Sequence, residues 1–396
     1  MNKANSSALY KIVSEKIQNS SALQITFAEY LDLVLYHSQY GYYSSGTVAI
    51  GAQGDFFTAS SLGKDFGELL AVQFVEMWHQ LDCPETFSVV EMGAGNASLA
   101  QDILNYLVVH HQEILPSLEY VILEKSPELI KQQQKLLANW SEVNLKWKSW
   151  LEIDDRSLVG CCFSNELIDA FAVHQVIIKD RQLKEVYLTL ESGKITEIYG
   201  EISTPQIAKY FKLIDIDLLQ QNYPDGYRTE VNLAALDWLD TVNRKLYQGY
   251  LLTIDYGYPA TKYYHPQRSQ GTLQCYYQHR RHNNPYVNLG QQDITTHVNF
   301  TALENYGKQQ GLATLGLTKL AIFLMALGLG DRLQELSSGK YNVMEVLQRR
   351  DALHQLMNPT GLGGFGVLLQ GKNLNQTQQK ITGLKILDEL SLGYNN

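Results

Sequence analysis

Short apolar runs alternate with longer amphipathic segments along this chain of 396 residues. An apolar run of about four to eight residues is typical of a buried β-strand, whereas apolar residues that recur every three or four positions indicate a helix. The runs predict core strands at residues 87–92, 120–123, 144–147, 158–164, 249–257, 312–318 and 365–370. Because helical patterns separate most of these runs, the sequence predicts an α/β fold with a doubly wound sheet.

The same periodicity predicts the helices. They are expected at residues 8–20, 26–36, 62–80, 97–109, 204–221, 230–247, 299–310 and 343–357. Thr26, with Glu29 three positions later, has the spacing of a capping box. Pro127 directly after Ser126 is typical of a further helix start.

Three further runs, at 173–179, 183–190 and 194–200, have strand composition and are separated by the turn signals Lys179-Asp180 and Ser192-Gly193. They predict a β meander inserted into the core. Residues 37–61 and 256–296 show no periodicity and are expected to be loops. We therefore expect a helical N-terminal extension with a site-covering loop (1–82), the first half of the core (83–172), the inserted meander and helices (173–248), and the second half of the core with its long loop and C-terminal strands (249–396).

The segment 87–99, FSVVEMGAGNASL, reads as a strand, a tight turn and the start of a helix. Gly93 and Gly95 allow a close approach of a ligand to the backbone, and the free amides of the helix start face that ligand. A nucleotide-like cofactor is the expected occupant, although a turn without a ligand has the same pattern and the third glycine of the dinucleotide motif is absent. Glu91 at the tip of the first strand resembles the E/D-x-G-x-G signature of class I S-adenosyl-L-methionine methyltransferases.

Acidic residues also follow two other predicted strands. Glu124 comes after the strand at 120–123, where a carboxylate can accept the hydroxyl hydrogens of a ribose, or can instead cap a helix or join a salt bridge. Glu166 and Asp169, in SNELIDA, would share a face if a helical turn begins there and could hold an amine or guanidinium; the alternative is acids that favour a helix start. His174 is a candidate base or a core histidine with a partner.

Composition and charge argue against several kinds of partner and site. The net charge of −9 argues against a nucleic-acid partner and is compatible with a cationic ligand, a basic protein or simple solubility. The four cysteines have no metal-ligand spacing, so buried thiols and no metal site are expected. The longest apolar run, 320–329, is too short to span a bilayer, and the N-terminus shows no targeting pattern, so no membrane insertion and a cytoplasmic location are expected.

Tyrosines are numerous and gather at residues 40–43, 263–264 and 276–277. Aromatic faces can hold a cation or cover a site, and ordinary packing is the alternative.

Five blocks of the sequence together resemble the MidA-like methyltransferases, a family that includes the mitochondrial complex I assembly factor that methylates an arginine. The blocks are GDFFTASSLGKDFGELL, VVEMGAGNASLAQDIL, SNELIDAFAVHQ, LTIDYGY and GTLQCYYQHRRHNNPYVNLGQQDITTHVNFTAL, spread over about residues 24 to 372. The resemblance implies S-adenosyl-L-methionine (SAM) as cofactor. It also implies a Rossmann-like sheet of seven strands whose last strand runs antiparallel between the fifth and the sixth.

The resemblance also implies roles for individual residues. Gly54, Asp55 and Thr58 would wall the SAM pocket, and Glu91, Gly93, Ala94 and Gly95 would form its floor. Glu124 would bind the ribose. Asn165 would contribute to both the cofactor and the acceptor, and Glu166 and Asp169 would face the acceptor. Gln292, Asp293, Thr295 and His297 would close the site, His297 as a catalytic residue; loop residues that only hold a turn are the alternative. Ala94, Asn96-Ala97 and Ala172 replace the glycines and the proline common in the family.

The leading hypothesis is therefore a SAM-dependent protein arginine N-methyltransferase that acts on a subunit of a respiratory complex I-like dehydrogenase. A small-molecule O- or C-methyltransferase is the alternative enzyme, and it would need a base such as His174 or His297. A non-catalytic assembly factor that binds SAM is the third hypothesis. The oligomeric state cannot be read from the sequence.

Overall fold

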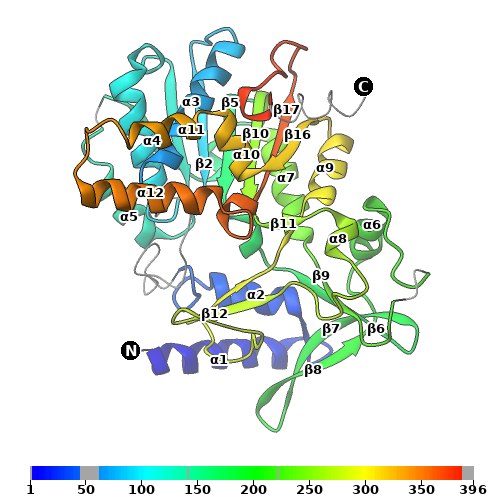
Figure 1. Cartoon of the computed structure of the whole chain (residues 1–396). Helices are drawn as coiled ribbons and strands as arrows, with labels where there is room; N and C mark the ends of the chain where they lie inside the picture. The colour runs from blue at the N-terminus through cyan, green and yellow to red at the C-terminus, as the bar shows by residue number, and fades with distance from the viewer. Residues whose placement is uncertain (1, 45–61, 141, 221–222, 386–396) are drawn as a thin grey trace. The chain divides into compact units, whose positions relative to one another are not determined.

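The computed structural model describes residues 2–44, 62–140, 142–220 and 223–385 (Figure 1). Gly54, Asp55 and Thr58 lie outside these residues. The chain forms two compact units, each built from separate stretches of sequence. Unit 1 contains Met1–Phe56, Ile168–Leu239 and Gly257–Tyr306, and unit 2 contains Phe57–Leu167, Asp240–Tyr256 and Gly307–Asn396. The four-part division expected from the sequence stays a prediction.

Unit 2 is organised around a seven-stranded sheet, counted over the described residues, with the order β16-β17-β10-β5-β2-β3-β4. β17 is antiparallel to both β10 and β16, while the other neighbours pair in parallel. The strand order implied by the family resemblance is therefore confirmed. The strands are β2 (Phe87–Met92), β3 (Leu118–Leu123), β4 (Asn144–Lys148), β5 (Leu158–Asn165), β10 (Leu246–Asp255), β16 (Ala313–Lys319) and β17 (Gly366–Lys372).

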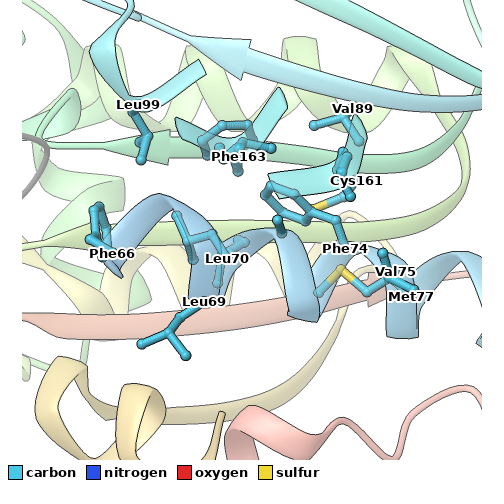
Figure 2. Packing of buried hydrophobic residues seen from close by; sticks show 14 of the residues in the cluster. Phe66, Leu69, Leu70, Phe74, Val75, Met77, Val89, Leu99, Cys161 and Phe163 are labelled. Atoms are coloured by element: carbon cyan, nitrogen blue, oxygen red, sulfur yellow. The ribbon is translucent and has the colours of Figure 1, made fainter. Parts of the chain in front are cut away.

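The central strands are mostly apolar, as expected where both faces of a sheet are covered. All six residues of β2 are buried. One hydrophobic cluster joins the sheet to its helices, and Figure 2 shows α3 residues packed against β2 and β5, with the rings of Phe74 and Phe163 5.0 Å apart. The helices of unit 2 are α3 (Asp65–Gln80), α4 (Ser98–His110), α5 (Pro127–Leu136), α10 (Leu320–Ala326), α11 (Leu329–Glu335) and α12 (Val343–Met357).

Unit 1 contains the antiparallel sheet predicted as a meander. β6 (His174–Lys179), β7 (Gln182–Glu191) and β8 (Lys194–Gly200) are joined by two-residue turns. Asp180, Arg181, Ser192 and Gly193, the four turn residues, have positive φ, the geometry that matches the twist of a hairpin. β1 (Ile25–Thr26) and β9 (Arg228–Val231) complete the sheet.

The remaining elements of unit 1 are short or helical. They are α1 (Asn2–Asn19), α2 (Phe27–Tyr36), α6 (Pro205–Leu213), α8 (Ala260–Tyr263), β11 (Gly257–Tyr258), β12 (Gln274–Tyr277), β13 (Arg280–His282), β14 (Asp293–Thr295) and β15 (Val298–Asn299). α7 (Leu233–Lys245) and α9 (Phe300–Gln309) begin in unit 1 and end in unit 2. The capping box is confirmed: Glu29 N donates to Thr26 Oγ1 (3.1 Å), and Thr26 N donates to Glu29 Oε2 (2.9 Å).

Three predictions are corrected. The helix expected over 204–221 ends at Leu213, and the helix expected from residue 230 begins at Leu233 because 228–231 pairs with β6 as β9. The expected loop 256–296 contains short strands and a helical turn. Tertiary pairing overrides local preference in such short segments, whose own periodicity is too brief to detect.

The cysteines are free thiols. Cys161, Cys162 and Cys275 are buried as expected, whereas Cys83 is exposed. Burial raises the pKa of Cys162 to about 12. Among the described residues, no cluster of His, Cys, Asp and Glu has an arrangement that could hold a metal ion. Over the same residues, none of the helices has both the length and the apolar character that a membrane crossing requires.

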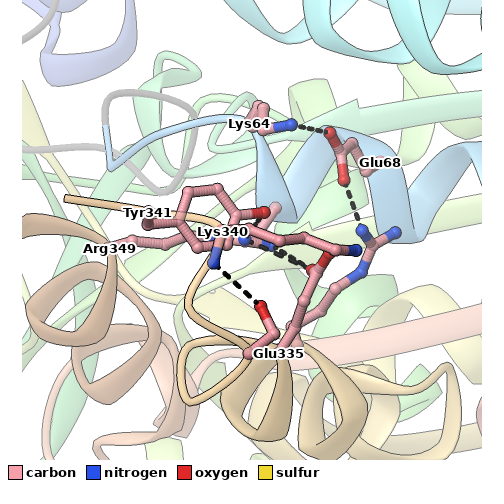
Figure 3. Close-up of polar contacts among 9 residues, drawn as sticks. Lys64, Glu68, Glu335, Lys340, Tyr341 and Arg349 are labelled. Carbon is pink, nitrogen blue, oxygen red and sulfur yellow. Dashed lines mark hydrogen bonds and ion pairs between the residues drawn. The ribbon is translucent and has the colours of Figure 1, made fainter. Parts of the chain in front are cut away.

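A polar network links the start of α3 to α11 and α12 (Figure 3). Arg349 makes a bidentate contact with Asp65, with Nη2 2.6 Å from Oδ1 and Nε 2.8 Å from Oδ2, and both side chains are largely buried. Glu68 pairs with Lys64 (2.8 Å) and with Arg332 (2.7 Å). The C-terminal helices are therefore attached to the first turn of α3 by buried charge pairs.

We predict that Arg349→Met destabilises the protein by on the order of 3 kcal/mol, because it leaves the buried carboxylate of Asp65 without its partner. Arg350→Met is the matched control, since Arg350 and its partner Asp351 are exposed. Chemical denaturation of both variants measures the difference. Equal effects for the two would contradict the assigned role of Arg349.

Candidate functional site

The carboxyl end of β2 carries the first acidic residue of the candidate site. Glu91 is only 3% exposed, and its Oε2 accepts a hydrogen bond from the hydroxyl of Tyr120 on β3 (2.7 Å). Burial raises the pKa of Glu91 to about 7, against the opposing effect of the Tyr120 bond. The carboxyl group therefore titrates near neutral pH and is held in place by the neighbouring strand.

The turn after β2 depends on its two glycines. Gly93 (φ 73°) and Gly95 (φ 56°) are both in the left-handed region. A Cβ on Gly93 would lie 2.8 Å from Leu167 Cδ1, so a side chain there would also need a shift of its neighbour. Ala97 is also left-handed (φ 63°) and directly precedes α4. The backbone is thus folded tightly at the carboxyl edge of the sheet.

Glu124 follows β3, the strand adjacent to β2. Its Oε1 accepts hydrogen bonds from the backbone N–H of Lys125 (2.8 Å) and Ser126 (2.9 Å). Burial raises the pKa of this carboxyl, and the hydrogen bonds act in the opposite direction. Oε2 accepts only one long bond among the described residues, from Gln133 Nε2 at 3.4 Å. Since each carboxylate oxygen can accept two, Oε2 retains capacity for hydroxyl donors.

Asn165 is the last residue of β5, the other neighbour of β2. The pairing of Met92 with Ser164 brings this strand end beside the glycine turn. Asn165 Nδ2 donates to Glu166 Oε1 (3.4 Å), and Glu166 N donates to Ile254 O (2.9 Å). Unit 2 therefore brings together the ends of β2, β3 and β5, with Glu91, the glycine turn, Glu124, Asn165 and Glu166.

The expected helical face shared by Glu166 and Asp169 is wrong. Glu166 has φ 52°, and the 3₁₀ turn begins only at Ile168. Glu166 belongs to unit 2, whereas Asp169 belongs to unit 1. Spacing along the sequence could not show this, because the left-handed residue interrupts the helical geometry.

Unit 1 brings a second group of predicted residues together. The hydroxyl of Tyr43 donates to Asp293 Oδ1 (2.6 Å), and Thr296 N donates to the backbone oxygen of Asp169 (2.9 Å). Burial, followed by the charges of Asp293 and Asp169 among others, raises the pKa of Tyr43. The ring of Tyr36 stacks on that of Tyr43, with 5.4 Å between the centroids. Tyr36 is not among the site residues expected from the sequence, and the nearby tyrosines at 40–43 are the feature that could have indicated it.

His297 has a different environment. Its ring stacks on Tyr258 (5.0 Å between centroids), and its backbone N–H donates to Thr272 Oγ1 (3.1 Å). Burial, and then the nearby charges of Arg268 and Arg281, lower the pKa of His297 to about 4. The imidazole is therefore neutral near pH 7 and has little affinity for a proton.

The other predicted residues are held within their own secondary structure or by single contacts. His174 Nδ1 lies 2.7 Å from the buried Glu185 Oε1, which agrees with a core histidine that has a partner. Gln292 Nε2 donates to Asn284 O (3.1 Å), and Thr295 is buried on β14.

Over the described residues, the order of the seven strands, with an acid near the end of the first, a G-x-G turn after it and an acid after the second, is that of a class I methyltransferase. The sequence model of the family "Putative S-adenosyl-L-methionine-dependent methyltransferase" matches residues 69–318, more than half of the chain. The chain belongs to this family. It is a SAM-dependent methyltransferase of the MidA-like group, as the motif resemblance implied.

Named relatives agree with this assignment. The Drosophila melanogaster protein arginine methyltransferase NDUFAF7 homolog is 26% identical over 83% of this chain and 77% of that protein. Human NDUFAF7, a mitochondrial protein arginine methyltransferase, is 27% identical over 86% and 78%. A crystal structure from Burkholderia thailandensis, bound to S-adenosyl-homocysteine, is 30% identical, with a TM-score of 0.83 and coverage of 97% of this chain and 96% of that one.

We predict that Glu91→Gln stabilises the ligand-free protein at pH 8 and leaves its stability unchanged near pH 4. Because the pKa of Glu91 is raised from 4.5 to about 7, the contribution of this group to native stability is greatest below pH 4.5 and is lost as the pH rises to about 7. The full shift corresponds to at most about 3 kcal/mol, and glutamine can still accept the Tyr120 bond. Denaturation across this pH range, with the exposed Glu85→Gln as control, tests the sign; a difference independent of pH would contradict it.

Proposed function

We propose that the protein transfers a methyl group from SAM to an arginine side chain of another protein. The observation that carries the proposal is the Asn165–Glu166 strand end, held beside the glycine turn by the pairing of β5 with β2. A carboxylate and an amide at this edge of an open sheet are suited to orient a guanidinium, which stays charged near neutral pH. The relatives named as arginine methyltransferases support the same acceptor.

SAM fits the chemistry of unit 2. The left-handed glycines leave the backbone of the turn accessible, and Glu124 keeps acceptor capacity for ribose hydroxyls. We assign Glu91, Gly93, Ala94, Gly95 and Glu124 to cofactor binding. Asn165 is assigned to both cofactor and acceptor. Gly54, Asp55 and Thr58 keep their expected cofactor role.

The transfer needs little covalent work from the protein. A guanidinium nitrogen attacks the methyl carbon in line, the bond from that carbon to the sulfonium sulfur breaks, and S-adenosylhomocysteine leaves. The nitrogen then releases one proton to a carboxylate or to water. Glu166 is the proposed acceptor-side residue of unit 2, whose negative charge stabilises and orients the cationic substrate. Asp169, in unit 1, keeps its expected acceptor role.

The alternative of a small-molecule O- or C-methyltransferase finds less support. That chemistry needs a base whose pKa lies near the working pH. His297, with a pKa of about 4, is a poor proton acceptor at pH 7, and His174 already pairs with Glu185. His297 keeps a proposed catalytic place only as a neutral hydrogen-bonding group.

We expect calorimetric titration to show binding of SAM and S-adenosylhomocysteine, with Glu124→Ala weakening both by about 10- to 100-fold. The loss follows from removing a charged acceptor of hydroxyl hydrogen bonds. Glu128→Ala, an exposed acid in the first turn of α5, is the control. No binding by the unchanged protein would refute the enzyme and the SAM-binding assembly factor together.

We expect incubation with isotopically labelled SAM and a lysate of the source organism to place label on arginine, as mapped by mass spectrometry. Glu166→Gln should reduce this label more than His297→Ala. A carboxylate is needed to orient and stabilise the guanidinium, whereas the transfer does not require a neutral base. Label on lysine or only on metabolites would contradict the proposal. Cofactor binding without any labelled product would favour an assembly factor.

The motif resemblance further suggests a subunit of a complex I-like dehydrogenase as the acceptor protein. Its identity, and the cytoplasmic location expected from the sequence, stay predictions that the labelling experiment and cell fractionation address.

A further inference from the structure

Three consecutive glutamines lie on α5, and only the middle one is buried. Gln132 and Gln134 are exposed, whereas Gln133 is 0% exposed. Leu129, one helical turn earlier, is also buried, so Gln133 occupies a position on the core-facing side of the helix where an apolar residue is normally expected. A buried amide is unfavourable unless its hydrogen bonds are made.

The amide of Gln133 contacts three separate segments of unit 2. Nε2 donates to the backbone oxygen of Gly95 (2.8 Å) and to Glu124 Oε2 (3.4 Å). Oε1 accepts from the indole Nε1 of Trp147 on β4 (2.9 Å). The glycine turn, the acid after β3 and the edge strand β4 are thus connected through one side chain.

The orientation of this amide is determined by its partners. The indole N–H can only donate, while the Gly95 carbonyl and the Glu124 carboxylate can only accept. Reversing the amide would place its oxygen against both acceptors and its NH₂ group against the indole N–H. Both Nε2 hydrogens therefore point to the two segments that are proposed to bind SAM.

We propose that Gln133 is a positioning residue for the cofactor. It holds the Glu124 carboxylate at a fixed distance from the glycine turn, so that the ribose anchor and the turn present one preformed surface to SAM. This inference rests on the proposed role of Glu124 in cofactor binding. Preorganisation of this kind raises affinity because less motion is lost when the ligand binds.

We expect Gln133→Met, which keeps the size and removes the hydrogen bonds, to weaken S-adenosylhomocysteine binding by about tenfold. Gln133→Glu should weaken it more, because a second carboxylate would face Glu124 and the Gly95 carbonyl. Gln132→Met and Gln134→Met are matched controls on the same helix and should bind within about twofold of the unchanged protein. Calorimetry measures the affinities, and thermal melting without ligand verifies folding.

A double-mutant cycle with Glu124→Ala separates positioning from a general effect on the fold. If Gln133 acts through Glu124, Gln133→Met should cause little further loss of affinity in the Glu124→Ala protein. Equal losses in both backgrounds, or unchanged binding by Gln133→Met, would overturn the inference. Absence of binding by the unchanged protein would instead refute the proposed function.

Trp147→Phe provides a test if Gln133→Met does not fold. It removes the indole N–H that orients the amide, together with part of the indole ring system, while an aromatic ring is kept. A smaller loss of S-adenosylhomocysteine affinity than for Gln133→Glu, with the protein still folded, supports the positioning role. Unchanged affinity for both Trp147→Phe and Gln133→Glu would overturn it.

Discussion

The parallel pairing of β2 with β3 on one side and β5 on the other is the constraint on which the candidate site depends. Parallel strands end at the same edge of a sheet, so residues far apart in sequence meet there without any special loop. Glu91, Glu124 and the Asn165–Glu166 pair reach this edge because each follows or ends one of the three strands. The apolar cluster around Phe74 and Phe163 keeps the strands in register, and in this way the core determines the geometry of the polar edge.

The acids at this edge are buried to different degrees and are stabilised by different means. Glu91 has the hydroxyl of Tyr120 as partner, and its desolvation shifts its titration toward neutral pH. The Glu124 carboxylate instead accepts hydrogen bonds from two backbone amides and from the Gln133 side chain, and these bonds hold it in one orientation. The two carboxyl groups that are proposed to bind the cofactor therefore differ in environment: desolvation dominates at Glu91, whereas several hydrogen bonds oppose desolvation at Glu124.

Unit 1 contains acidic and aromatic side chains that lie close to one another. Tyr43 bonds to Asp293, and Asp169 is held through its backbone oxygen by Thr296. His297 lies in the same unit, where burial and then the nearby charges of Arg268 and Arg281 lower its pKa and keep the imidazole neutral. Carboxylates near aromatic faces are compatible with a cationic ligand, although the arginine proposal itself depends on the Asn165–Glu166 strand end of unit 2.

Elements whose signals are local could be predicted from the amino-acid sequence. The seven core strands, the glycine turn, the Thr26 capping box and the meander turns follow from periodicity, from glycine conformation and from capping chemistry, all of which act over a few residues. The motif resemblance added the strand order and the family. The tertiary structure decided the rest: β9 and the strands of residues 256–296, the left-handed Glu166, the low pKa of His297 and the burial of Gln133 among three identical neighbours. These features depend on partners that are distant in sequence, such as Gly95 and Trp147 for Gln133. A local sequence pattern cannot show which polar side chain will be buried, or which charged group will lie next to it.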